Sequence, residues 1–109
     1  MDWLVFSTIS SLISFSLHML DLILTVFGIV FLGKVESNPF FAQLPLYQFV
    51  VIKIFGATMI SMLMVTYGYL MKYKKRNRML DIVPYFVSHF LAIYIMLDVV
   101  AHNFRVISR

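Results

Sequence analysis

The first apolar stretch of the chain, WLVFSTISSLISFSLHMLDLILTVFGIVFL (3–32), contains only two ionisable side chains, His18 and Asp21. A helix needs about 20 apolar residues to cross roughly 30 Å of hydrocarbon, so this stretch is long enough to span a membrane. Asp2 precedes the stretch as a suitable N-cap, and Gly33 follows it as a suitable helix stop. The pattern therefore predicts a transmembrane helix over residues 3–32.

Two further apolar stretches, residues 46–71 and 79–104, flank a basic loop over residues 72–78. Neither shows the sustained alternation of a strand, and membrane barrels need at least about eight strands. We therefore predict an all-α integral membrane protein with three transmembrane helices, forming a single membrane domain over residues 1–109. The absence of early Lys or Arg residues favours a retained first span over a cleavable signal peptide.

The composition agrees with a lipid environment. Of the 109 residues, 61% are hydrophobic and only 13% are charged. A water-soluble domain of this size could not bury so much apolar surface. The chain has no cysteine, which excludes disulfides, thiolate metal sites and cysteine nucleophiles. No phosphate-binding glycine loop or nucleophile motif is present, so the sequence gives no sign of catalysis.

The basic residues indicate an orientation. Five of them lie within 72–78, whereas the first loop contains only Lys34, and short cytoplasmic loops are rich in Lys and Arg. We therefore expect a multi-pass protein of the cytoplasmic membrane with a cytoplasmic N-terminus and an extracytoplasmic C-terminus, although Arg105 and Arg109 oppose this choice. A basic run beside a span is typical of topology or lipid contact, so we expect lipid partners and no nucleic acid.

Ionisable side chains inside the spans are the main functional candidates, because each costs a few kcal/mol in lipid and is usually paired, buried or functional. They are His18, Asp21, Lys53, His89, Asp98 and His102. Measured from the outer helix ends at about 1.5 Å per residue, they form two layers. Lys53, Asp98 and Asp21 lie roughly 10–18 Å deep, and His18 and His89 lie roughly 22 Å deep.

The upper layer has two interpretations. Lys53 would form a structural ion pair with Asp21 or Asp98, since pairing is the usual fate of intramembrane charge. Alternatively, the three residues form a proton or ion relay, because one lysine cannot fully satisfy two separated carboxylates. The second carboxylate then needs a histidine, water or a partner subunit.

Two helical pairs are candidate metal ligands. Asp98 and His102 are spaced i, i+4, and His18 and Asp21 are spaced i, i+3, so each pair lies on one helix face. Imidazole with carboxylate suits zinc, copper or iron. The alternative is that both spacings arise by chance and His102 lies at the water interface.

Small and aromatic residues indicate packing rather than chemistry. The small residues of the second span mark where it approaches a neighbour closely; they are Gly56, Ala57, Ser61 and Gly68. Aromatic residues lie mostly near span ends, as in an interfacial belt; they are Trp3, Tyr47, Tyr67, Tyr69, Tyr73 and Tyr85.

A pattern of spaced polar residues joins the first span to the second. It comprises Asp21, Thr25, Gly33, Glu36, Asn38, Pro39 and Lys53. Over residues 17–60 it resembles a prokaryotic small membrane-protein family of unknown function. The resemblance implies a helical-hairpin core and a role for Asp21, Glu36, Asn38 and Lys53. Turn chemistry favours a structural role for Glu36, Asn38 and Pro39 in the connection between the first two helices.

The whole chain, by its size, three spans, lack of cysteine and basic second loop, is similar to the small accessory subunit family of archaeal ammonia monooxygenase. This resemblance implies a helical subunit beside partner subunits that hold copper, with no cofactor in this chain. The sequence thus favours a non-catalytic accessory subunit of a larger membrane complex. The alternatives are a small oligomeric proton- or ion-coupled carrier using Asp21, Lys53 and Asp98, and a metalloenzyme component using His18, Asp21, Asp98 and His102.

Overall fold

The computed structural model describes residues 2–33, 43, 45–73 and 79–108. Within these residues the chain forms three helices, α1 (Trp3–Leu32), α3 (Leu46–Tyr73) and α4 (Met79–Ile107), and no strand. Each is long and apolar enough to cross a membrane, which confirms the predicted all-α class. The first helix has the predicted bounds, whereas α3 and α4 continue past residues 71 and 104.

Both predicted end signals of α1 are confirmed. The Asp2 Oδ1 atom accepts hydrogen bonds from the backbone N–H groups of Leu4 and Val5 at 3.0 and 3.2 Å. At the other end Gly33 has the left-handed φ of 65°, which glycine adopts without steric cost, and its N–H donates to the carbonyl of Gly28. Local capping therefore fixes the length of the helix on which the polar residues lie.

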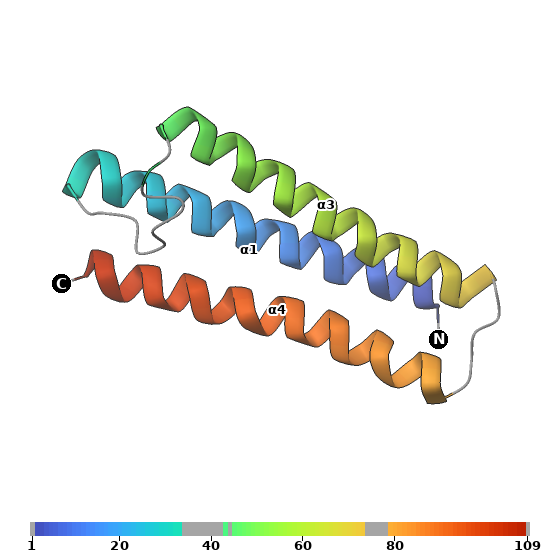
Figure 1. The fold of residues 1–109 in the computed structure, drawn as a ribbon. Coiled ribbons are helices and arrows are strands. Elements are labelled where there is room, and N and C mark those ends of the chain that lie inside the picture. Colours follow the sequence, from blue (N-terminus) through green and yellow to red (C-terminus); the bar gives the residue numbers. More distant parts are fainter. Residues whose placement is uncertain (1, 34–42, 44, 74–78, 109) are drawn as a thin grey trace.

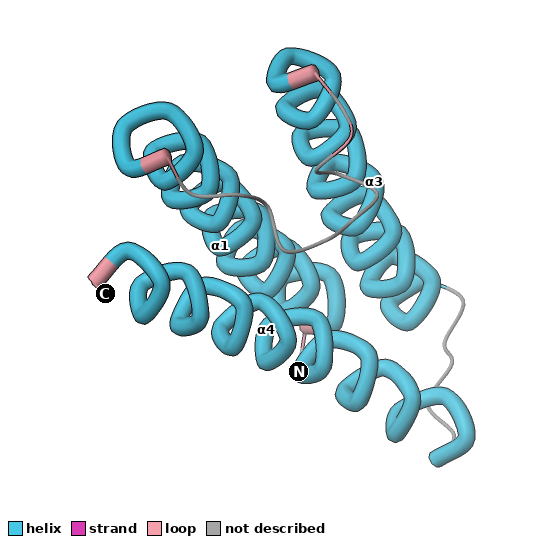
Figure 2. The backbone as a smooth tube through the Cα atoms, turned by 60° about the vertical axis from the view of Figure 1, so that its left-hand side comes forward, coloured by secondary structure: helices cyan, strands magenta, loops and turns pink. Residues whose placement is uncertain are grey.

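The helix α1 lies between the other two. It contacts both α3 and α4 along its length, while α3 and α4 barely touch each other (Figure 2). The first turn of α1 lies at the same end as the last turn of α3 and the first turn of α4, and the last turn of α4 lies at the opposite end (Figure 1). We call these the N-terminal end and the C-terminal end of the bundle. The helix α1 is therefore antiparallel to α3 and parallel to α4.

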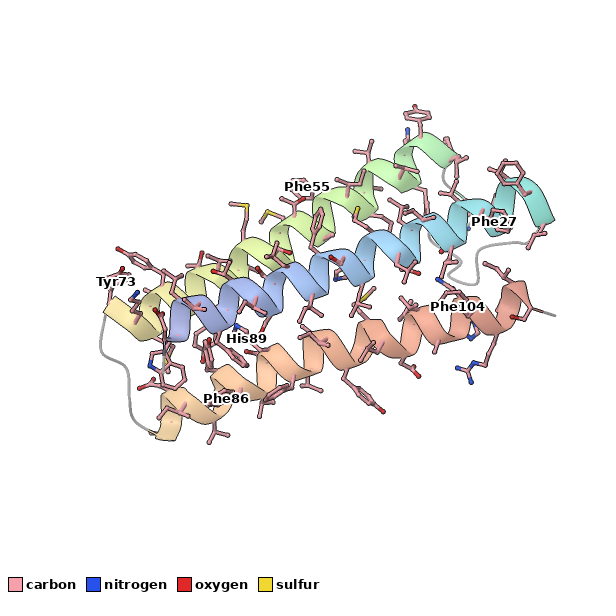
Figure 3. The ribbon with its side chains drawn as sticks, turned by 180° about the vertical axis from the view of Figure 1, so that it is seen from behind. Phe27, Phe55, Tyr73, Phe86, His89 and Phe104 are labelled. Carbon is pink, nitrogen blue, oxygen red and sulfur yellow. The ribbon has the colours of Figure 1, made fainter. Side chains whose placement is uncertain are left out.

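The buried face of α1 is polar. Its buried residues are Ser7, Ser10, Ser11, Ser14, Asp21, Leu22 and Gly28. Large apolar side chains point outward instead; Phe27 and Phe55 point away from the bundle, and Phe55 is 66% exposed (Figure 3). This distribution suits lipid, because small residues let backbones approach closely where apolar burial supplies no driving force. Four of the buried positions, Ser7, Ser14, Asp21 and Gly28, recur every seventh residue, the repeat of a helix-packing seam.

The closest approach of α1 and α3 lies at Gly68. A Cβ atom built on Gly68 would lie 2.4 Å from the Cβ of Ser7. The backbone of α3 at Gly68 therefore packs directly against the Ser7 side chain of α1. Ala57 is also buried, and the Ser61 hydroxyl donates to the carbonyl of Ser11 at 3.4 Å. The small-residue prediction therefore holds at three positions, but it is wrong at Gly56, where a Cβ atom would meet nothing within 4 Å.

Candidate functional site

The first polar cluster surrounds Asp21, whose side chain is buried inside the bundle. The Lys53 Nζ atom lies 3.6 Å from Asp21 Oδ2, and the Thr25 hydroxyl donates to Asp21 Oδ1 at 3.4 Å. The amide of Asn103 donates to the same Oδ1 atom. We call Asp21, Thr25, Lys53 and Asn103 the aspartate cluster. Of the two predicted partners for Lys53, the structure therefore brings Asp21 within ion-pair distance.

The register of the helices explains why these residues meet. Three separate contacts join α1 to α4 at a sequence separation of 82 residues: Trp3 with Tyr85, Ser7 with His89, and Asp21 with Asn103. A constant offset is expected for parallel helices with the same rise per residue. This offset brings Asn103 level with Asp21. The residues near either position in the sequence do not indicate that the two would meet.

The same register corrects the predicted layers. The predicted depths aligned the outer helix ends at Leu32 and Phe104, which implies an offset of about 72 residues. The observed offset is about ten residues larger, and this difference corresponds to roughly 15 Å along the helix axis. His89 therefore lies level with Ser7, not with His18. The predicted layer of His18 and His89 is wrong, because α1 and α4 are staggered along their axes.

A polar cavity of about 330 Å³ adjoins the aspartate cluster. Side chains from all three helices line it; they are Asp21, Thr25, Lys53, Asp98, Val99, His102, Asn103 and Arg105. Asp98 and His102 are both exposed at its edge. Among the described residues Asp98 has no hydrogen-bond or ion-pair partner. The cavity therefore contains one carboxylate held by Lys53 and a second that faces outward.

A second cluster lies toward the N-terminal end around His89. The Ser7 hydroxyl oxygen lies 2.7 Å from the Tyr85 hydroxyl and 2.8 Å from His89 Nε2, and the Tyr85 hydroxyl donates to the carbonyl of Trp3 at 2.7 Å. We call Ser7, Tyr85 and His89 the histidine cluster. His89 points from α4 toward α1 (Figure 3). All three side chains are fully or almost fully buried.

The tautomer of His89 follows from its neighbours. Its Nδ1 atom lies 2.8 Å from the carbonyl oxygen of Tyr85, which can only accept, so Nδ1 carries a hydrogen. The Nε2 atom lies 2.8 Å from the Ser7 hydroxyl oxygen. Tyr85 was expected in an interfacial belt, but that interpretation is wrong, because its ring is 0% exposed and its hydroxyl is bonded inside the bundle. Sequence reasoning missed Ser7 as its partner; the seven-residue repeat from Ser7 to Asp21 is the signal that could have identified it.

Serine hydroxyls continue the polar face between the two clusters. Ser7 and Asp21 are separated by about four turns, roughly 21 Å along α1, with Ser10, Ser11 and Ser14 buried between them. We call this face, from Ser7 to Asp21, the polar seam. The Ser14 hydroxyl is buried and has no hydrogen-bond partner within the described structure.

The four candidate metal ligands do not form one site. Among the described residues no three His, Asp or Glu side chains gather closely enough to hold a metal ion. Asp21, Asp98 and His102 line the same cavity, but His18 is not among its lining residues. The predicted turn residues Glu36, Asn38 and Pro39 lie outside the described residues.

A surface contact joins the helices at the N-terminal end. The Lys72 Nζ atom lies 3.2 Å from Asp2 Oδ2, on the same carboxylate that caps α1. The hydrogen bond from the backbone N–H of Val5, together with the nearby Lys72, holds the pKa of Asp2 below its ordinary value of 3.8. This contact therefore ties α3 to the first turn of α1.

Comparison with known proteins finds no matching family model, no matching curated protein and no matching solved structure. The function of the chain is therefore inferred from the geometry of the polar seam and of the outer surface.

Proposed function

We propose that this chain is a non-catalytic accessory subunit of a larger membrane-embedded complex. The observation that carries the proposal is the open arrangement of the helices, in which α3 and α4 barely touch. A three-helix unit that does not close around an interior leaves faces on which further helices can pack. In membranes such packing depends on close approach and polar contacts.

Two shallow grooves on the outside of the helices support this role. One of about 560 Å³ runs between α1 and α3 and contains Ser11, Thr58 and Ser61 among apolar neighbours. Another of about 360 Å³ lies beside α3 and includes Tyr67 of α3 and Asp81 of α4. Small hydroxyl residues in an apolar groove are typical of helix–helix interfaces in lipid.

Native purification of the tagged full chain tests the proposal. We expect the chain to migrate in mild detergent with larger membrane subunits, identified by mass spectrometry of the intact complex. Thr58→Leu, which fills the α1–α3 groove from an exposed position, should weaken assembly, whereas Phe55→Leu on the lipid face should not. A chain that migrates alone, in native membranes and under crosslinking, would remove the proposal.

The complex to examine first is archaeal ammonia monooxygenase, because the three-span plan and basic second loop resemble its small accessory subunit. In that setting copper would belong to the partner subunits and this chain would contribute packing surface. Copper analysis of the purified chain alone and of the intact assembly distinguishes the two locations.

A second candidate function, a small oligomeric proton- or ion-coupled carrier, is favoured by the polar seam. The seam extends over roughly 21 Å and ends at Asp21 and Lys53. Proton flux into liposomes containing the chain alone would support a carrier, provided that Asp21→Asn abolishes the flux. Its absence, together with co-migration of larger subunits, would favour the accessory role.

We also propose that the N-terminus is cytoplasmic and the C-terminus extracytoplasmic. Support comes from the five basic residues of 72–78, because the last turn of α3 and the first turn of α4, which flank this run in the sequence, lie at the same end as the first turn of α1. The aspartate cluster would then lie in the extracytoplasmic half of the membrane.

A further inference from the structure

The helix register places Asp98 level with the middle of α1. The offset of 82 residues between α1 and α4 puts Asp98 level with Ser16. That level is roughly 20 Å along the axis from Trp3 and roughly 24 Å from Leu32. A carboxylate at this depth is among the most unfavourable groups that a lipid-facing helix can carry.

Asp98 is nevertheless exposed on α4, at the edge of the 330 Å³ cavity. The contacts inside the bundle do not compensate its charge. Of the two cations that line this cavity, Lys53 lies 3.6 Å from Asp21 Oδ2, and no described residue forms a hydrogen bond or ion pair with Asp98. Arg105 is two helical turns away, roughly 10 Å along the axis. Within the described residues, Asp98 is therefore a carboxylate without an ion-pair partner, although Lys53 and Arg105 line the same cavity.

We propose that Asp98 is the docking residue for a transmembrane helix of a partner protein that carries one arginine or lysine at mid-membrane depth. This proposal rests on the accessory role and names the chemistry of the partner. The partner's cation forms an ion pair with the Asp98 carboxylate, and its apolar residues cover the face of α4 around Asp98, where Tyr94 and Ile95 are 68% and 54% exposed.

Other occupants fit this position less well. A lipid headgroup lies at the membrane surface, roughly 15 Å from the centre of a 30 Å hydrocarbon layer. A metal ion would find only the Asp98–His102 pair on this helix face, and no group of three ligands gathers among the described residues. A second copy of this chain would offer Lys53, which lies beside Asp21 in its own bundle.

A defined probe tests the pairing. The full chain, labelled with an acceptor dye at Ser108→Cys, is reconstituted in phosphatidylcholine vesicles with donor-labelled single-span Leu/Ala helices. The helices carry arginine, glutamine or leucine at the central position. The chain has no natural cysteine, so the label is unique. Energy transfer then reports association of each helix with α4.

We expect the arginine helix to associate roughly tenfold more tightly than the leucine helix, a value within the range for polar contacts between membrane helices. Asp98→Asn should bring this ratio close to one, and Asp98→Glu should retain it. Val87→Asn is the control, since it introduces the same amide at an exposed position of α4, about three turns before Asp98, and leaves the carboxylate in place. Its ratio should equal that of the unaltered chain.

Two results would overturn the proposal. One is an arginine preference that is absent from the unaltered chain or persists in Asp98→Asn. The other is energy transfer between labelled copies of the chain that depends on Asp98, which would assign the residue to self-association. Either result leaves the accessory role intact if larger subunits still co-purify with the Asp98→Asn chain, so the two proposals fail separately.

Discussion

At the scale of single residues, two serines on the buried face of α1 differ in whether their hydroxyl groups have partners. Ser7 contacts Tyr85 and His89, whereas the Ser14 hydroxyl has no hydrogen-bond partner within the described structure. A buried polar group without a partner destabilises the fold, and its removal can be stabilising. The same substitution should therefore have opposite effects at these positions.

We predict that Ser14→Ala leaves stability unchanged or raises it by up to about 1 kcal/mol, while Ser7→Ala lowers it by about 1–2 kcal/mol. The measurement is reversible unfolding of the chain in mixed detergent micelles, followed by circular dichroism. Equal losses at the two positions would show that the seam depends on serine size rather than on hydrogen bonding.

The ion pair of the aspartate cluster allows a second residue-scale prediction. Lys53→Met leaves the buried Asp21 without its cation and should destabilise the bundle by roughly 2 kcal/mol. Asp21→Asn together with Lys53→Met should recover more than half of that loss, because neither charge then remains. Unfolding of the two single variants and the double variant in micelles gives the coupling energy, and additive losses would mean that the two charges do not interact.

At the scale of helices, the approach of α1 and α3 at Gly68 gives a matched pair of glycine substitutions. Gly68→Ala places a methyl group 2.4 Å from the Ser7 Cβ atom, so the helices must separate. We expect a loss of about 1–3 kcal/mol, typical of overpacking. Gly56→Ala meets nothing within 4 Å and should be neutral or stabilising by up to about 1 kcal/mol. Unfolding midpoints measured side by side test this difference, and equal midpoints would contradict the close approach.

The helices themselves were predictable because the length of an apolar stretch and the capping residues at its ends are local properties of the sequence. Asp2 and Gly33 define α1 without reference to other parts of the chain. The relative position of the helices was not predictable, since the offset between α1 and α4 depends on contacts such as Trp3 with Tyr85. The pairing of Lys53 with an aspartate was predicted because intramembrane charges are usually paired. Asn103 and the partners of His89 were missed because they depend on the offset between the helices.

At the scale of the whole molecule, the basic connection over 72–78 should control orientation. We predict that replacing four of its basic residues with glutamine inverts the membrane orientation of a large share of the chains. These residues are Lys74, Lys75, Arg76 and Arg78. A single Ser108→Cys then reports the side of the C-terminus by reaction with a membrane-impermeant maleimide in oriented vesicles. Lys34→Gln is the control and should leave the labelling unchanged, while unaltered labelling in the neutralised chain would contradict the prediction.

The central position of α1 has a consequence for biosynthesis. This helix is translated first, yet it contacts both later helices and carries the acid that Lys53 neutralises. At about 5–20 residues per second, the ribosome reaches Lys53 roughly 2–6 s after Asp21, and Asn103 several seconds later still. During that interval the carboxyl group of α1 has neither partner. The insertion machinery must therefore shelter this carboxyl group until α3 arrives.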